Sequence, residues 1–192
     1  MSQSAPSPQP APSFKPNSEC IAELYELIDD VKIAMLTTVD RDGSLVSRPM
    51  TTQARRDGVD LWFMATTDTH TVDAIHHQPE VNLMYYKEHT KDWVSASGAA
   101  TLTQDLELIH GLYQKDWKIW LGDEGGDNDG GPEDPRIVLI EVHVHTINYF
   151  KSDNSRPVQL LKIAKAALTG VKPDLGEVRH LDANELRSAD AN

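Results

Sequence analysis

The chain has 192 residues, of which 39% are hydrophobic and 25% are charged, a composition that fits one globular domain with a hydrophobic core. Its 18 lysine and arginine residues against 30 aspartate and glutamate residues give a formal net charge of −12. Nucleic acids and anionic membranes bind to clustered basic residues, which the sequence lacks, so we expect neither as a partner.

Residues 1–16 are rich in proline, serine and alanine. This composition does not bury enough apolar area to offset the entropy of ordering, so we expect a disordered tail. The tail lacks the basic and hydrophobic regions of a signal peptide, and no apolar run approaches the roughly 20 residues that span a bilayer. With Cys20 as the only cysteine, the sequence predicts a cytoplasmic protein without an internal disulfide.

Periodic apolar residues along the rest of the chain predict a few helices and six strands. Helices are expected after the N-cap Ser18 and over 69–77, 105–117 and 158–168. Strands are expected over 33–39, 45–53, 61–65, 81–86, 93–102 and 137–145, with Gly43 in a hairpin turn, a second turn at 57–58 and a bulge or bend at Gly98. This pattern favours a mainly β domain with peripheral α-helices, built as a closed or nearly closed antiparallel barrel. We place the domain at residues 17–151, followed by a C-terminal helix and charged tail over 152–192.

Two polar segments raise the question of a metal site. Residues 122–135 are rich in glycine and aspartate, but their spacing does not match a calcium-binding loop, so we interpret them as a solvated surface loop. His143 and His145 share one face of the last strand, yet no cysteine cluster or further motif completes a set of ligands. We therefore expect no metal.

Arg48 is the first candidate for binding an anion. It shares one face of its strand with Val46 and Met50, and a guanidinium group in such a place needs a carboxylate or a ligand anion as partner. Pro49 cannot donate a ladder hydrogen bond, which leaves neighbouring backbone free to contact a ligand. A structural ion pair and an anion site both remain possible for Arg48.

A second candidate follows where residues 66–71 pass from a strand into a helix. Four threonines there surround Asp68 and His70, and their hydroxyl groups and the free N–H groups of the helix N-terminus could bind a phosphate. An ordinary N-cap by Thr67, Asp68 or Thr69 would account for the same residues. Both interpretations stay open.

Six short motifs lie in a fixed order along the chain, together with Gly43: Ala34-Met35-Leu36-Thr37-Thr38, Ser47-Arg48-Pro49-Met50, Leu61-Trp62-Phe63-Met64-Ala65-Thr66, Trp120-Leu121-Gly122, Asp134-Pro135-Arg136 and Asn148-Tyr149-Phe150. Over about residues 19–151, their order resembles the flavin-binding split barrels related to pyridoxamine 5'-phosphate oxidase, specifically the bacterial general stress protein branch. The resemblance implies a six-stranded antiparallel split β-barrel of the FMN-binding type. It also implies a homodimer with two flavin sites at the interface, each lined by both chains.

The resemblance also implies roles for individual residues. Arg48 would contact the flavin phosphate, the backbone of Met50 would lie near the ring, and Thr66 and Thr67 would contact the ring or the ribityl chain. His70 and Thr71 stand where relatives commonly have a serine or arginine and then a lysine. The remaining candidates for cofactor binding are Pro49, Gln53, Trp93, Ser95 and Trp120, while Trp117, Trp120 and Phe150 could cover a ring from the partner subunit or pack in the core.

The implied cofactor is FMN, with FAD as an alternative because the lysine that would hold the phosphate is missing. The implied activity is that of a flavin-dependent oxidoreductase, with a nicotinamide nucleotide as candidate electron donor. A non-catalytic flavin carrier or sensor in the stress response is the alternative, and a split barrel that binds haem or deazaflavin ranks third. True pyridoxamine 5'-phosphate oxidase activity is not expected, because Arg179-His180 only faintly resembles the substrate-binding segment of those enzymes. No catalytic residue can be assigned.

Overall fold

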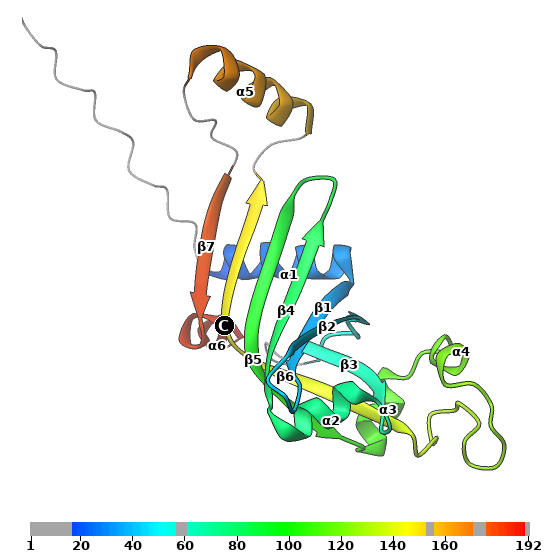
Figure 1. Cartoon of the computed structure of the whole chain (residues 1–192). Coiled ribbons are helices and arrows are strands. Elements are labelled where there is room, and N and C mark those ends of the chain that lie inside the picture. The colour runs from blue at the N-terminus through cyan, green and yellow to red at the C-terminus, as the bar shows by residue number, and fades with distance from the viewer. Residues whose placement is uncertain (1–16, 57–60, 153–155, 171–175, 191–192) are drawn as a thin grey trace, which may run out of the picture.

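One antiparallel sheet dominates the computed structural model, which describes residues 17–56, 61–152, 156–170 and 176–190 (Figure 1). The strands are β1 (Ile33–Val39), β2 (Leu45–Thr51), β3 (Leu61–Thr66), β4 (Glu80–Lys87), β5 (Asp92–Thr103), β6 (Ile137–Ser152) and β7 (Gly176–Asp182). The helices are α1 (Asn17–Val31), α2 (His70–His77), α3 (Leu106–Leu112), α4 (Trp117–Leu121), α5 (Arg156–Thr169) and α6 (Ala183–Asp190). The predicted tail over 1–16 and the turn at 57–58 lie outside the described residues.

The sheet closes on itself. Its strand order is β2-β1-β4-β5-β6-β3, and β7 pairs with β6 beside this path. At the two ends of the order, Thr52 forms a bridge to Phe63, and the N–H of Gln53 donates to the carbonyl of Trp62 at 2.8 Å. The predicted mainly β split barrel is therefore confirmed, and the described residues form seven strands in place of the expected six.

The additional strand pairs with the second half of β6, which continues to Ser152 where the sequence predicts an end at residue 145. Along one edge of β6, residues 137–142 pair with β3 and residues 146–152 pair with β7. The prediction of a charged tail missed both β7 and α6. Two leucines, Leu181 and Leu186, are buried and attach these otherwise polar elements to the core.

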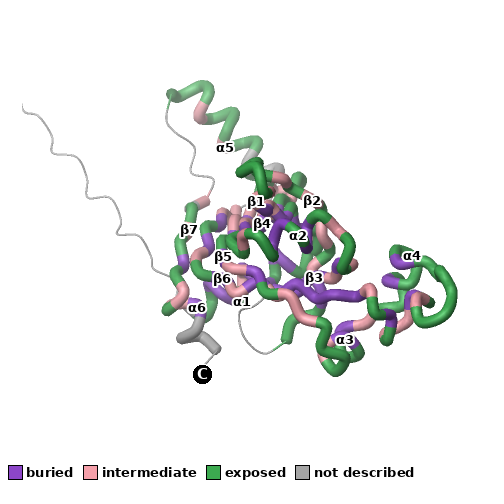
Figure 2. The backbone as a smooth tube through the Cα atoms, turned by 60° about the horizontal axis from the view of Figure 1, so that its bottom comes forward, coloured by how far each residue is buried: buried purple, intermediate pink, exposed green. Residues whose placement is uncertain are grey.

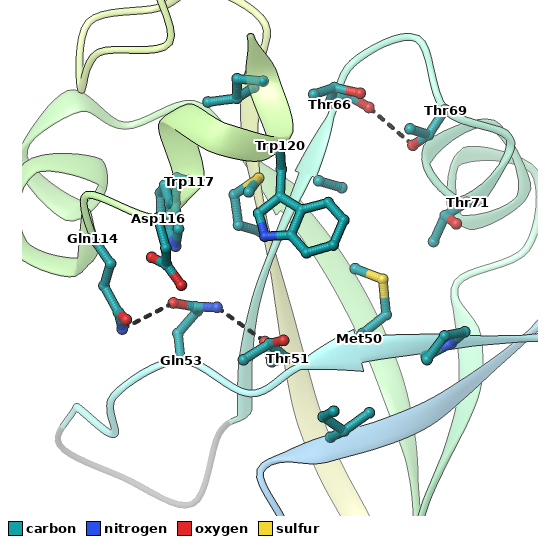
Figure 3. Close-up of a pocket in the computed structure, with 15 residues that line it drawn as sticks. Met50, Thr51, Gln53, Thr66, Thr69, Thr71, Gln114, Asp116, Trp117 and Trp120 are labelled. Atoms are coloured by element: carbon teal, nitrogen blue, oxygen red, sulfur yellow. Dashed lines mark hydrogen bonds between the residues drawn. The ribbon is translucent and has the colours of Figure 1, made fainter.

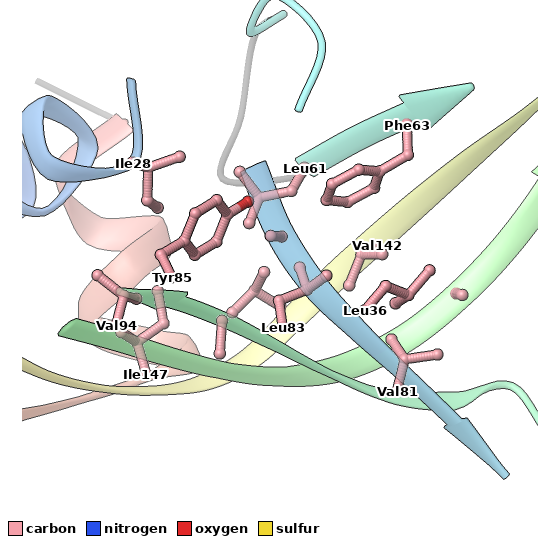
Figure 4. Packing of buried hydrophobic residues seen from close by; sticks show 14 of the residues in the cluster. Ile28, Leu36, Leu61, Phe63, Val81, Leu83, Tyr85, Val94, Val142 and Ile147 are labelled. Atoms are coloured by element: carbon pink, nitrogen blue, oxygen red, sulfur yellow. The ribbon is translucent and has the colours of Figure 1, made fainter. Parts of the chain in front are cut away.

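The main core fills the barrel and includes apolar residues of α1 and α2. Figure 4 shows part of it, between α1 and the strands. Tyr85 lies in it fully buried, and its hydroxyl group is hydrogen-bonded to Thr52 at 2.8 Å. Burial raises the pKa of this phenol far above its ordinary value. The predicted bulge at Gly98 is confirmed, because the β5–β6 register shifts after Ser97 and a side chain at Gly98 would overlap the carbonyl of His143.

A second, smaller core lies outside the barrel, where α3 and α4 cover β3 and the start of β6. The sequence predicts one helix over 105–117, but the chain leaves the helical conformation at Tyr113, whose ψ is 131°. The hydroxyl of Tyr113 donates to the carbonyl of Gly130 at 2.7 Å, and Trp117 is buried in the new helix. Tertiary contacts therefore break the predicted helix in two.

Candidate functional site

An open pocket of about 560 Å³ lies where the end of β2, the end of β3, the start of α2 and α4 come together (Figure 3). The residues that line it come from segments far apart in the sequence: Ile33, Pro49, Met50, Thr51, Gln53, Met64, Ala65, Thr66, Thr69, Thr71, Gln114, Asp116, Trp117, Trp120 and Leu121. Its volume falls within the range of roughly 300–1,000 Å³ that is usual for small-molecule and cofactor sites.

The walls of the pocket are mainly apolar. Met50 and Met64 approach from the two strands, and Trp117 and Leu121 approach from α4, where both belong to the second core. Trp120 extends over the pocket with 81% of its surface exposed (Figure 3). A flat aromatic ligand could therefore contact methionine on one side and tryptophan on the other.

A buried amide marks the polar end of the pocket. The side chain of Gln53 donates from Nε2 to the carbonyl of Thr51 at 2.9 Å, and its Oε1 accepts from Nε2 of Gln114 at 3.3 Å (Figure 3). Asp116, on the same loop as Gln114, adds an exposed carboxylate. This end can donate to or accept from the polar edge of a ring.

Three threonines line the end of the pocket near α2. Thr69 is the N-cap, because its hydroxyl accepts from the N–H of Val72 at 3.5 Å and donates to the carbonyl of Thr66 at 2.9 Å. The N-cap interpretation is thus confirmed for Thr69. Thr71 is buried, and its hydroxyl forms no hydrogen bond to another described residue, so it remains available to a ligand.

Arg48 does not line the pocket, although Met50, two residues along the same strand face, does. Its Nη1 donates to the buried hydroxyl of Thr38 at 3.3 Å. Within the described parts of the chain, this half-buried guanidinium group forms no ion pair, so the structural alternative lacks its expected carboxylate. Arg41, by contrast, forms a bidentate pair with Asp73 on the surface.

The candidate residues separate into two groups. Pro49, Met50, Gln53, Thr66, Thr71 and Trp120 line the pocket, whereas Arg48, Thr67, His70, Trp93 and Ser95 do not. Thr67 and His70 line a shallower hollow of about 400 Å³ beside α2. Trp93 and Ser95 lie on the outer face of the sheet, where Ser95 accepts a hydrogen bond from Asn82. Contact of either group with a cofactor stays a prediction.

Sequence reasoning missed several lining residues, among them Met64, Gln114 and Asp116. The sequence predicts a strand for Met64, but whether its side chain reaches the pocket depends on how β3 meets α4. Gln114 and Asp116 fall in the break between α3 and α4, which the sequence does not reveal. No local pattern distinguishes these residues from ordinary surface positions.

The acidic loop between α4 and β6 has a buried anchor at its base. The carboxylate of Asp134, whose side chain is 0% exposed, accepts from Nε and Nη2 of Arg136 at 3.0 and 2.7 Å. It also accepts from the N–H of Gly130 at 2.8 Å, and Nη2 of Arg136 donates to the carbonyl of Gly122 at 3.1 Å. These hydrogen bonds, chiefly those from Arg136, lower the pKa of Asp134 to about 2.

This anchor connects the loop to the site. The carbonyl of Arg136 accepts from the N–H of Thr67 at 2.9 Å, at the point where β3 ends. The loop lies on the surface, as the sequence predicts, but its two ends are held together beside the pocket rather than freely solvated. The interpretation as a merely solvated loop overlooked this pair, because its two residues lie only two positions apart in a polar run.

The described segments contain no helix that is long and apolar enough to cross a membrane. Over the same segments, no group of three or more histidine, cysteine, aspartate or glutamate side chains is arranged to hold a metal ion.

Comparison with known proteins places the chain in a family. The family model described as "Pyridoxamine 5'-phosphate oxidase like" matches residues 19–174. Protein bli-3 of Neurospora crassa is 32% identical over 176 residues, which cover 90% of this chain and 84% of bli-3.

Two solved structures share the fold. A candidate general stress protein 26 from Jannaschia sp. CCS1 gives a TM-score of 0.68 at 21% identity, over 86% of this chain and 99% of that one. The general stress FMN/FAD binding protein of Xanthomonas citri gives a TM-score of 0.58 at 21% identity, over 71% of this chain and 92% of that one. The family match, the bli-3 relative and the split-barrel fold agree: the chain belongs to the pyridoxamine 5'-phosphate oxidase-like family.

Proposed function

We propose that the pocket binds FMN and that the protein is a flavin-dependent oxidoreductase. The observation that carries this proposal is the combination, in one pocket, of an apolar slot and a polar end. Met50 and Trp120 would hold the isoalloxazine ring, while the amides of Gln53 and Gln114 would meet its polar edge. The Xanthomonas citri protein with the same fold is described as binding FMN or FAD, which supports a flavin as the ligand.

The phosphate would lie between Arg48 and the start of α2. Arg48 is half-buried without an ion pair to any described residue, which leaves its charge for a ligand anion. The hydroxyl of Thr71 and the N-terminal N–H groups of α2 add neutral donors near the pocket. Because His70 and Thr71 supply no lysine, we expect the phosphate to be held mainly by Arg48.

We further propose that the protein is a homodimer whose flavin sites lie at the subunit interface. The outer face of the sheet exposes Ile33, Met35 and Tyr86, with Met84 and Trp93 half-buried between them. Ile33 also lines the pocket, so the pocket opens onto this apolar face. A second copy on the face would bury these side chains and close the open side of the pocket.

A bound flavin would supply the electron-transfer chemistry, and the protein would supply binding, orientation and exclusion of water. Of the described lining residues, the exposed Asp116 carries the only ionisable side chain. The lining thus offers no buried acid or base to move a proton. This observation favours, as a second candidate, a flavin carrier or sensor that performs no turnover.

Titration with FMN and FAD, followed by visible absorption and by quenching of flavin fluorescence, tests the binding proposal. We expect Arg48→Ala to weaken FMN binding at least tenfold, because it removes the principal charge at the phosphate. Arg41→Ala is the matched control, since Arg41 lies on the same hairpin but is already paired with Asp73. Equal FMN affinity in Arg48→Ala and wild type would reject the phosphate assignment.

Anaerobic addition of NADH or NADPH to the flavin-loaded protein separates the two candidate functions. Bleaching of the flavin absorption at a rate above that of free FMN is the result expected of an oxidoreductase with a nicotinamide donor. A bound flavin that stays oxidised would instead favour the carrier. Failure of all flavins to bind would contradict both.

A further inference from the structure

Helix α5 is an exception to the rule that apolar side chains are buried. It stands beyond the end of β6 and the start of β7, clear of the barrel (Figure 1), and the tube coloured by burial shows it almost entirely exposed (Figure 2). Its largest apolar side chains are 46–89% exposed: Leu160, Leu161, Ile163 and Leu168. A helix of 14 residues with such side chains in water lacks the packing that normally stabilises it.

These apolar side chains share one face of the helix. At 3.6 residues per turn, Leu160, Leu161, Ile163, Ala164, Ala167 and Leu168 fall within an arc of about 160°. Lys165 and Thr169 lie on the other side, together with Lys162 and Ala166, the two described positions that are least exposed. The apolar face of α5 is therefore exposed, as are Val158, Lys165 and Thr169 on the other side, whereas an ordinary surface helix buries its apolar face.

The charge of α5 is also opposite to that of the rest of the molecule. Its 14 residues include Arg156, Lys162 and Lys165 and no acidic residue. Since the whole chain carries −12, the other 178 residues carry −15 (−12 minus +3). A basic helix is thus complementary to the acidic surface of another copy of the same chain, whereas that acidic surface would be repelled by an anionic bilayer.

Apolar side chains also form a row across the outer face of the sheet, starting in β7, the strand that follows α5 in the sequence. Val178, 63% exposed, follows the helix in β7 and pairs with Phe150, and Phe150 pairs with Trp93, whose other neighbour is Tyr86. The helix is about 21 Å long at 1.5 Å per residue, so a face about 10 Å wide offers only about 200 Å². Since a stable interface buries about 800 Å² per partner, α5 must add to a larger contact rather than form one alone.

We propose that α5 is a dimerisation arm whose apolar face packs on a second copy of this chain, beside the outer face of the sheet. This proposal rests on the homodimer proposed above, but it does not depend on flavin binding. The arm would contribute Leu160, Ala164 and Ala167 at the centre of its contact and Ile163 at one edge. Lys165 would lie just beyond the edge of this contact, where its charge can approach the acidic surface of the partner, whereas Lys162 lies on the far side of the helix.

Sedimentation velocity of the full chain over a concentration series tests the arm. We expect Leu160→Glu to raise the dimer dissociation constant at least tenfold, because it places a charge at the centre of the apolar contact. Thr169→Glu, on the opposite side of the same helix, is the matched control and should change the constant less than threefold. Leu168→Glu, a second position on the apolar face, should act like Leu160→Glu.

Amide hydrogen exchange provides a direct readout at the helix. Protection of residues 158–169 should increase with protein concentration in wild type and not in Leu160→Glu. If Leu160→Glu and Leu168→Glu both dimerise with the wild-type dissociation constant, α5 is not a dimerisation arm, although the protein is still a homodimer. A monomeric wild type would overturn both, and the flavin titration would still decide the binding proposal.

The apolar face of α5 could instead bind a membrane surface, and vesicles of phosphatidylserine and phosphatidylcholine test this alternative. We expect the wild-type chain not to co-sediment with them. Co-sedimentation that is abolished by Leu160→Glu, with no concentration-dependent protection of α5, would replace the arm by a membrane contact.

Discussion

The loop between α4 and β6 and the helix α5 show opposite relations between composition and environment. The loop is acidic and rich in glycine, yet the carboxylate at its base is completely buried. Helix α5 is rich in leucine and alanine, yet it projects from the barrel and is exposed along most of its length (Figure 2), its leucines included. An ion pair holds the base of the loop against the barrel. Among the described residues, helix α5 has no core beside it on which its apolar face could pack.

The comparison separates interactions within one chain from those that need a second chain. The loop is stabilised by its own residues, because Asp134 and Arg136 satisfy each other and the backbone around them. The leucines of α5 are instead exposed on their own chain. We therefore expect substitutions in the loop to affect folding of the monomer, and substitutions in α5 to affect association.

The largest effect is expected from Asp134→Ala. Removing one partner of a buried ion pair leaves the other charge uncompensated, so we expect the free energy of unfolding to fall by about 3–5 kcal/mol in urea denaturation. Asp127→Ala, an exposed position in the same loop, should change it by less than about 0.5 kcal/mol. If the two variants were equally stable, the buried pair would not be the anchor of the loop.

Two leucines, one in α4 and one in α5, test the difference between a buried and an exposed helix. Leu121 in α4 is buried and lines the pocket, so Leu121→Ala should lower the free energy of unfolding by about 2–4 kcal/mol. Leu168 in α5 is 89% exposed, so Leu168→Ala should change it by less than about 0.5 kcal/mol in a solution dilute enough to contain monomers. A large loss in monomeric Leu168→Ala would mean that α5 packs on its own chain.

The smallest effect is the dependence of stability on pH. The pKa of Asp134 is lowered to about 2 in the folded chain, so its contribution is complete above its unfolded pKa of about 4 and is lost as pH falls toward 2. The difference in free energy of unfolding between wild type and Asp134→Asn should therefore be constant from pH 7 to about pH 5 and shrink at lower pH. Urea denaturation at several pH values measures it, and a difference that grew on acidification would contradict the assignment.

Much of the barrel follows from local sequence patterns. Alternating or continuous apolar runs predict the six long strands, and Gly43, with a φ of 83°, marks the hairpin between β1 and β2. The sequence does not predict β7, since Leu181 is its only buried residue among the described side chains and pairs with Ile147, 34 residues earlier (181 − 147). Long-range pairing of this kind leaves little local signal.

The site is less accessible to sequence reasoning than the fold. Thr66 and Thr71 could be expected near one another, because they bracket a single strand-to-helix junction. Gln114 and Trp120 reach the pocket only because tertiary contacts of Tyr113 and Trp117 break the predicted helix. For Arg48 the sequence left a carboxylate and an anion as alternatives, and the described residues supply no carboxylate.

The pairing of β6 with two successive strands has a consequence for solubility. Residues 146–152 would present a row of free N–H and C=O groups if β7 detached, next to the exposed side chain of Tyr86 two strands away. Such an edge is a template for strand addition from another molecule. By pairing with this edge, the short polar strand β7 protects the barrel from aggregation. For this protection, its backbone hydrogen bonds matter more than the little apolar surface that it adds to the core.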